Sequence, residues 1–288
     1  MPENYSENKN LDYKETKRFW EKRAERVRLT GNLFEANLSD NIPLQAIFKD
    51  AIEKQIIEKS APLMPDYEIL DLGCGSGRMS LFFARACKRV VAVDFSLALL
   101  ERARGNAMKC GLNNITFIEE NINSFYCKEK FDLIFLGGVL SYLNDADAKN
   151  MLGRAKEMLK PEGRLLIRDS LSFRKSCVIR EKYNKNFEDN YSVIYRSIKE
   201  FKSALKESGF AFDLETSLAI FPFMGLYHLV IKKIFGSGAI FAKLSKNYFG
   251  LVSYFSPFIL FYRNSGIYEF FAYLLNKYDQ RFFICSLK

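Results

Sequence analysis

The feature that most constrains the fold of this chain is the run EILDLGCGSGR, residues 68–78. An apolar stretch ends in an acid and passes directly into three glycines at alternate positions. Glycine is required where a turn is tight or where a ligand approaches the backbone, because any Cβ would collide there. The run therefore predicts a strand, a ligand-binding loop and a helix in that order. The plainer alternative is that Gly73 and Gly75 are only turn glycines.

The charged residues around this loop favour a cationic ligand over a dinucleotide. A dinucleotide fingerprint needs a glycine at the position that holds Arg78. Asp71, just before the glycines, would repel a pyrophosphate but attract a cationic amino-acid ligand such as S-adenosylmethionine, which carries an ammonium and a sulfonium. Asp94 ends the next apolar run, where a carboxylate accepts hydrogen bonds from the ribose hydroxyls of either cofactor. Its alternative role is as a helix N-cap together with Ser96.

Downstream of residue 66, short apolar runs alternate with amphipathic stretches, which is typical of a parallel sheet covered by helices on both faces. The segment LKPEGR, residues 159–164, has the composition of a loop between a helix and a strand. We expect an α/β fold with a Rossmann-like, seven-stranded, mostly parallel sheet. Strands are predicted at 67–72, 89–93, 115–119, 131–136 and 163–168, and helices near 77–88, 96–110, 145–159 and 197–208.

The two ends of the chain complete this architecture. Residues 12–28 and 43–60 are predicted to be helices, and residues 210–221 contain a sixth strand. The expected organisation is an N-terminal helical lid at 1–60, a Rossmann-like ligand-binding domain at 61–217, a helical, aromatic-rich cap or insertion at 218–280, and a final strand of the sheet at 281–288.

The composition narrows the setting in which the protein works. The 288-residue chain has 48% hydrophobic residues, enough for a full core, and a formal net charge of +9. Its basic residues are dispersed and show no RNA-binding signature, so no nucleic-acid partner is expected. The six cysteines form no CxxC pair and no cluster with histidine, which favours a reduced interior and no metal site. The polar N-terminus lacks a secretory apolar segment, so we expect a cytoplasmic protein.

Five segments of the chain resemble the motifs of the class I S-adenosylmethionine-dependent methyltransferase family. DLGCGSG (71–77) resembles the first motif of that family, and VDFS (93–96) resembles the segment with its ribose-binding acid. FIEENI (117–122) is similar to the segment that lies against the adenine. FDLIFLGGVLSYL (131–143) and LKPEGRLLIRDS (159–170) resemble the fourth-strand and fifth-strand motifs. The resemblance implies a Rossmann-like domain that binds S-adenosylmethionine.

The resemblance also implies roles for individual residues at the cofactor. Family members often have aspartate where this chain has Asn121, whose carbonyl still accepts from the adenine amino group; a plain turn residue is the alternative. Trp20, on the first helix, would either close over the cofactor or only pack that helix onto the core. Asp71 and Gly73 would hold the methionine moiety, Gly75 and Gly77 would let the backbone approach it, Asp94 would bind the ribose, Phe95 would flank the adenine, Asn121 and Ile122 would contact the adenine edge, and Gly137 would border the sulfonium.

Methyl transfer from a sulfonium requires chiefly that the acceptor lone pair is positioned near the methyl carbon. The candidate catalytic residues are Tyr142, Arg168 and Asp169. Each follows a predicted strand, at the edge where ligands of open α/β sheets bind. Asp169 would take a proton or orient the acceptor, and Arg168 would pair an anionic group; a salt bridge and a strand-end cap are the structural alternative. Residues 187–197 are expected to wall the acceptor pocket. His228, the sole histidine, serves as a base only if the insertion folds over the cofactor.

Two sixteen-residue stretches, 216–231 and 247–262, carry no charged residue. Both are shorter than the roughly 20 residues that a membrane-spanning helix needs, and each contains a proline. Basic residues flank them, as in an interfacial segment at acidic lipid. Residues 216–263 are therefore expected either to cap the sheet with buried aromatics, which favours a large apolar acceptor, or to make peripheral contact with the inner face of the membrane.

These patterns indicate an enzyme that methylates a small-molecule acceptor at oxygen or nitrogen, with S-adenosylmethionine as cofactor and no metal. One alternative is a methyltransferase that acts on a lipid or lipid-linked glycan at the membrane surface. Another is a protein that binds S-adenosylmethionine without methylating. The identity of the acceptor and the oligomeric state do not follow from the sequence.

Overall fold

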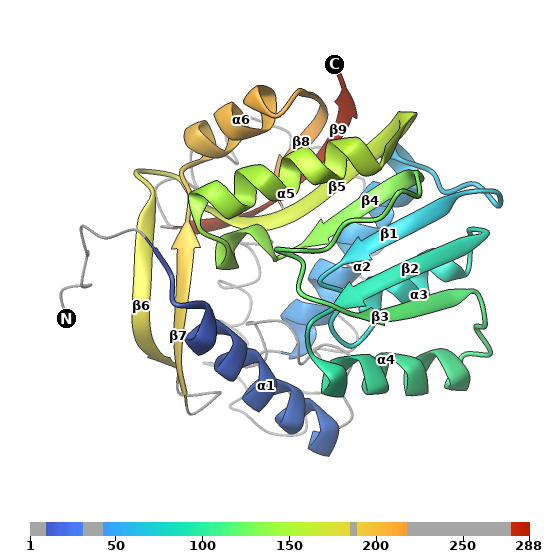
Figure 1. The fold of residues 1–288 in the computed structure, drawn as a ribbon, viewed down its shortest axis with the longest axis horizontal. Helices are drawn as coiled ribbons and strands as arrows, with labels where there is room; N and C mark the ends of the chain where they lie inside the picture. The colour runs from blue at the N-terminus through green and yellow to red at the C-terminus, as the bar shows by residue number, and fades with distance from the viewer. Residues whose placement is uncertain (1–9, 31–42, 185–188, 218–277) are drawn as a thin grey trace, which may run out of the picture.

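The computed structural model describes residues 10–30, 43–184, 189–217 and 278–288. Seven strands form one sheet in the order β3-β2-β1-β4-β5-β9-β8 (Figure 1). The first five pair in parallel, and β9 runs antiparallel to both of its neighbours. The predicted Rossmann-like sheet, including its last strand at the C-terminus, is confirmed. The strands are β1 (Glu68–Leu72), β2 (Arg89–Asp94), β3 (Ile115–Glu119), β4 (Phe131–Gly137), β5 (Leu159–Ser172), β8 (Phe210–Ser217) and β9 (Tyr278–Leu287).

Helices cover both faces of this sheet (Figure 1). Alternate residues of each central strand point to opposite faces, as the pleat requires. Leu70 and Leu72 pack with α5 and α6, whereas Ile69 packs with α2 and α3. The two apolar cores hold the sheet between two layers of helices. Because the central strands are parallel, the carboxyl ends of these strands meet at one edge of the sheet. The helices are α1 (Tyr13–Thr30), α2 (Pro43–Ser60), α3 (Arg78–Ala84), α4 (Leu97–Lys109), α5 (Asp145–Met158) and α6 (Ile198–Glu207), with a 3-10 turn η1 (Leu140–Tyr142).

The prediction of a loop at LKPEGR, residues 159–164, is wrong. Strand β5 begins at Leu159, directly after α5, and Leu159 pairs with Phe131 of β4. The register between β4 and β5 then shifts, which marks a bulge in the proline-containing stretch. Gly163 is required in this bulge, because a Cβ there would lie 2.9 Å from the backbone oxygens of both Lys160 and Phe131.

A two-stranded hairpin, β6 (Cys177–Asn184) and β7 (Asp189–Tyr195), is inserted between β5 and α6. The sequence predicted only that residues 187–197 wall a pocket. The hairpin packs against α1. The ring centroids of Phe19 and Tyr191 lie 6.2 Å apart, and Asp189 forms an ion pair with Lys22 at 3.4 Å. Helix α1 also contacts α4, so it extends from the hairpin to the other side of the sheet edge (Figure 1).

The cap or insertion predicted at 218–280 lies, apart from its last three residues, outside the described residues, and so does His228. The strands that border this segment are described: Ser217 at the end of β8 pairs with Arg281, and Tyr278 at the start of β9 pairs with Ser172. None of the helices in the described ranges combines the length and apolarity that crossing a membrane requires.

Substitution of two glycines by alanine is expected to change stability in opposite directions. Gly163→Ala places a Cβ against backbone oxygens in the bulge and should lower the free energy of unfolding by about 1–3 kcal/mol. Gly153→Ala lies within α5, where a Cβ meets no described atom within 4 Å, and should raise it by roughly 0.5–1 kcal/mol. Urea unfolding of both variants beside the wild type measures the difference, and a stabilising Gly163→Ala would contradict the bulge.

Candidate functional site

A cavity of about 670 Å³ opens at the carboxyl ends of β1, β2, β4 and β5. This is the size of pocket that holds a small ligand, and it lies where ligands of open parallel sheets bind. Residues of α1 and α2 also line this cavity. The predicted site residues that line this cavity are Trp20, Asp71, Gly73, Gly75, Asp94, Phe95, Asn121, Ile122, Gly137, Tyr142, Arg168 and Asp169.

The glycine loop between β1 and α3 needs its glycines for two different reasons. Gly73 has a positive φ of 75° and lines the cavity, and a Cβ there would collide with the side chain of Val139. Gly77 has a φ of 83° and packs against α4, where a Cβ would lie 2.9 Å from the Cβ of Ala103. The approach of the Gly77 backbone to a ligand therefore stays a prediction, while its packing role is direct.

The Asp94 carboxylate joins the end of β2 to the glycine loop. Its two oxygens accept the backbone N–H groups of Gly75 at 2.8 Å and Ser96 at 3.0 Å. Burial raises the pKa of Asp94, and the backbone N–H groups oppose that shift by stabilising the charged form. The N-cap of α4 is Ser96, whose hydroxyl accepts from Leu99, so the capping role belongs to Ser96 and not to Asp94.

Asp71 is buried at the end of β1, with 1% of its surface exposed. Burial raises the pKa of Asp71 to about 6, and the Ser80 hydroxyl, which donates to the carboxylate at 2.6 Å, opposes that shift. A cation arriving in the cavity would lower the pKa of this carboxyl, because an opposite charge nearby favours the ionised form.

Asp169 closes the other end of the cavity and holds η1. Its carboxylate accepts both the backbone N–H of Ser141, at 3.1 Å, and the Ser141 hydroxyl, and it also accepts the Ser170 N–H at 2.8 Å. Burial raises its pKa, and the hydrogen bonds from Ser141 oppose the shift most strongly. Asp169 and Arg168 do not follow the fifth strand, as predicted, but lie within β5, which continues to Ser172 because it pairs with β9. The hydrogen bonds of Asp169 to Ser141 and Ser170 favour a structural role over a free proton acceptor.

The Tyr142 hydroxyl is buried and has no hydrogen-bond partner within the part of the chain that the structure describes. Burial raises its pKa, so the hydroxyl stays protonated at neutral pH. The ring lies edge-on to Trp20 of α1, with centroids 5.2 Å apart. Trp20 thus packs its helix onto the cavity wall and lines the cavity, and its closure over the cofactor stays a prediction.

Arg196, predicted as part of the pocket wall, instead supports η1 from behind. The buried guanidinium donates to the carbonyls of Leu140 at 2.6 Å and Leu143 at 2.7 Å, and it binds Asp145 at 2.9 Å. Both ends of the turn that carries Tyr142 are therefore held, and the position of its hydroxyl is set by the fold.

Arg168 is engaged by the protein rather than free for an anion. Its Nε lies 3.2 Å from Glu53 of α2, and its Nη2 donates to the Gly137 carbonyl at 2.9 Å. Glu53 also binds Arg78, at 2.8 Å, and Asp50 binds Arg78 at 2.5 Å. Asp50 and Glu53 are not among the site residues predicted from the sequence, because only the apolar spacing of α2 identifies that helix.

Two further walls come from the loop after β3 and from α1. The Asn121 side-chain carbonyl accepts the Asn123 N–H at 2.9 Å. This is the turn geometry that the sequence left open as the alternative role of Asn121, and the residue also lines the cavity.

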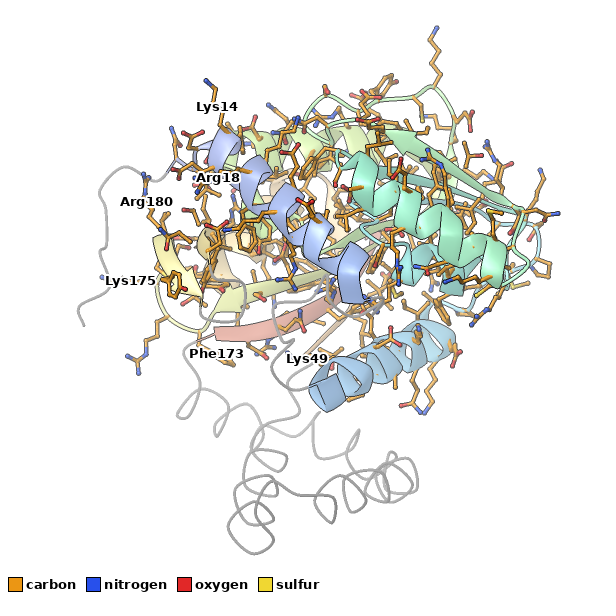
Figure 2. All side chains as sticks on the ribbon, turned by 90° about the horizontal axis from the view of Figure 1, so that it is seen from below. Lys14, Arg18, Lys49, Phe173, Lys175 and Arg180 are labelled. Carbon is orange, nitrogen blue, oxygen red and sulfur yellow. The ribbon has the colours of Figure 1, made fainter. Side chains whose placement is uncertain are left out.

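The Tyr13 hydroxyl of α1 accepts the Asn144 N–H at 2.9 Å and donates to Asp147. Figure 2 shows Lys14 and Arg18 farther along this helix.

The described residues contain no group of three or more His, Cys, Asp or Glu side chains arranged to hold a metal ion. The carboxylates at the cavity already accept hydrogen bonds from hydroxyls and backbone N–H groups or form ion pairs with arginines. Such carboxylates suit an organic ligand that carries positive charge and hydroxyl groups.

A family model described as "Methyltransferase domain" matches residues 69–163. Phosphoethanolamine N-methyltransferase 1 of Triticum aestivum is 28% identical over 196 residues, which cover 63% of this chain and 38% of that protein. The chain therefore spans less than two fifths of the length of this curated relative.

Solved structures share the fold at low sequence identity. Phosphoethanolamine N-methyltransferase 1 of Haemonchus contortus, in complex with phosphoethanolamine and S-adenosylhomocysteine, has a TM-score of 0.55 and 20% identity, covering 70% of this chain and 44% of that one. The cyclase SpnF has a TM-score of 0.54 and 14% identity, covering 83% and 81%. At these identities the likeness establishes the fold and not the reaction.

The raised pKa of Asp71 predicts a pH dependence of stability in the protein without ligand. The folded pKa of about 6 lies above the unfolded value of about 4, so the stability contributed by this group is full below pH 4 and is lost as the pH rises through 6. Asp71→Asn removes the titration. Relative to the wild type, its free energy of unfolding should rise by up to about 3 kcal/mol between pH 4 and pH 7.

Urea unfolding at four pH values measures this change. Asp66→Asn, which removes an exposed carboxylate close to β1, is the control for the loss of one charge. A difference between Asp71→Asn and the wild type that does not vary with pH would contradict the pKa of Asp71.

Proposed function

We propose that this protein transfers a methyl group from S-adenosylmethionine to a small-molecule acceptor, because residues 69–163 match the family model of a methyltransferase domain. The observation that carries the proposal is one cavity lined by two buried acids, Asp71 and Asp94, and by Tyr142, whose hydroxyl has no hydrogen-bond partner among the described residues. One end suits a cationic nucleoside, and the other end is left for the acceptor.

The residues at the cofactor end fit S-adenosylmethionine in charge and in hydrogen-bonding capacity. The Asp94 carboxylate accepts backbone N–H groups from Gly75, Ser96 and Phe95, and a carboxylate has about four acceptor sites, so one remains for a ribose hydroxyl. Asp71 and the backbone of Gly73 and Gly75 would hold the methionine moiety, and Phe95, Asn121 and Ile122 would surround the adenine. When bound, this cofactor supplies a methyl group on a sulfonium whose departure leaves a neutral thioether.

At the acceptor end, Tyr142 is the residue that meets the substrate in this proposal. Its protonated hydroxyl donates one hydrogen bond and accepts others, so it would orient an oxygen or nitrogen whose lone pair points at the methyl carbon. Asp169 and Arg196 act through η1 and hold the hydroxyl in place. Trp20 packs edge-on against the same ring and adds a second aromatic side chain to this wall of the cavity.

The described residues offer no observation in favour of a lipid or lipid-linked glycan as the acceptor. The likeness to a cyclase supports keeping the non-methylating alternative as an experimental outcome, since the same fold serves different reactions.

Isothermal titration and turnover test the proposal together. The wild-type protein should bind S-adenosylmethionine and S-adenosylhomocysteine but not NAD, and it should form S-adenosylhomocysteine when a small amine or hydroxyl acceptor is supplied. Asp94→Asn should weaken both ligands alike, by about tenfold or more, because both carry the ribose and a charge-assisted hydrogen bond is lost. Heat with NAD alone would overturn the proposal, and binding without turnover on an acceptor panel would favour the non-methylating alternative.

Tyr142→Phe separates the role of the hydroxyl from that of the ring. The hydroxyl has no partner among the described residues, so its removal should leave the free energy of unfolding unchanged or raise it by up to about 1 kcal/mol. If the hydroxyl orients the acceptor, kcat/KM should fall by about tenfold while the affinity for S-adenosylmethionine is kept. Leu143→Ile, a volume-conserving change beside it, is the control; unchanged kcat/KM in Tyr142→Phe would remove Tyr142 from the site.

A further inference from the structure

Glu53 of α2 is a buried carboxylate shared by two arginines. Its exposed surface is 2%, and its two oxygens lie 2.8 Å from Nη2 of Arg78 and 3.2 Å from Nε of Arg168. A carboxylate in such a position is held by charge on both sides, and removal of either arginine still leaves it one cation. Glu53 also lines the cavity.

The two arginines come from different elements, α3 and β5, and both line the cavity. Arg78 is the first residue after the glycine loop, at the start of α3. Arg168 lies at the far strand, donates to the Gly137 carbonyl, and fills the space beside that glycine, where a Cβ would come within 3.2 Å of its Nη2. Through these contacts one side chain of α2 connects the loop after β1 with the turn after β4.

The charge of Glu53 also reaches the methionine end of the cavity. It is among the groups that raise the pKa of Asp71, so the two carboxylates act on the same region. Lys49 lies one turn earlier on α2 (Figure 2) and brings another positive charge near Arg168. Burial, and next to it the positive charge of Arg168, lowers the pKa of Lys49. Asp169 and Asp279 also act on these two cations, and Glu53 is the carboxylate that forms an ion pair with Arg168.

We propose that Glu53 is a specificity-determining residue that maintains the affinity of the site for the positively charged methyl donor and has little effect on its affinity for the neutral thioether product. This inference rests on the proposed function, because it concerns S-adenosylmethionine at that same cavity. The physical reason is electrostatic: if the sulfonium lies next to Gly137, as the family resemblance implies, Arg168 without Glu53 would repel it, whereas a thioether carries no charge to be repelled. Glu53 offsets the charge of Arg168 and so removes a penalty that only the donor would feel.

Glu53→Gln tests this inference by titration with the two ligands, one charged and one neutral at sulfur. The full-length variant should bind S-adenosylmethionine about tenfold more weakly, while its affinity for S-adenosylhomocysteine should change by less than about twofold. A purely structural role would weaken both ligands by the same factor. Glu58→Gln, an exposed acid on the same helix, should leave both affinities unchanged.

Arg168→Gln gives an independent test with the opposite sign, and it applies even if Glu53→Gln does not fold. Glu53 then keeps only Arg78, so the ratio of donor affinity to product affinity should rise by about threefold or more. An equal effect on both ligands in the variants would overturn the role of Glu53 while the proposed function stands. A wild-type protein that binds neither ligand would overturn the proposed function itself.

Discussion

The carboxyl edge of the sheet buries acidic side chains, and the surrounding loops take their shape from the need to stabilise those charges. A carboxylate leaves water at little cost only when donors or cations replace its hydration shell. Asp71 has the hydroxyl of Ser80, and Asp94 has the N–H groups of Gly75 and Ser96. Each donor belongs to a loop or to a helix start, so the bonds that stabilise the acids also set the walls of the cavity.

The same principle organises the acceptor end, with a different result. Asp169 and Arg196 both donate to or accept from the short turn η1, so the place of Tyr142 in the cavity wall is fixed from two sides. The Tyr142 hydroxyl has no hydrogen-bond partner among the described residues, which leaves its hydrogen-bonding capacity unused in the protein without ligand. Because the fold is shared with enzymes of different chemistry, side chains such as this one, and not the sheet, decide the reaction.

The sheet and its helices were predictable from local pattern, since each central strand is a short apolar run bounded by turn residues. The hairpin was not, because a register shift between Ile179 and Lys182 breaks the alternation that identifies a strand. The start of β5 was missed for a related reason. Its proline and glycine are typical of a loop, yet the buried pair Leu159 and Phe131 extends the strand across the bulge.

The sequence by itself determined which side chains reach the carboxyl edge, because residues that end parallel strands must meet there; Asp71, Asp94 and Asp169 all line the cavity as expected. Only the tertiary structure decided what each of them does. Arg168 is bound by Glu53, which comes from a distant helix, and no local periodicity encodes that pairing. Desolvation and charge compensation depend on atoms that folding brings together, so the division between structural and ligand-facing groups appears only once α2, η1 and the sheet are packed.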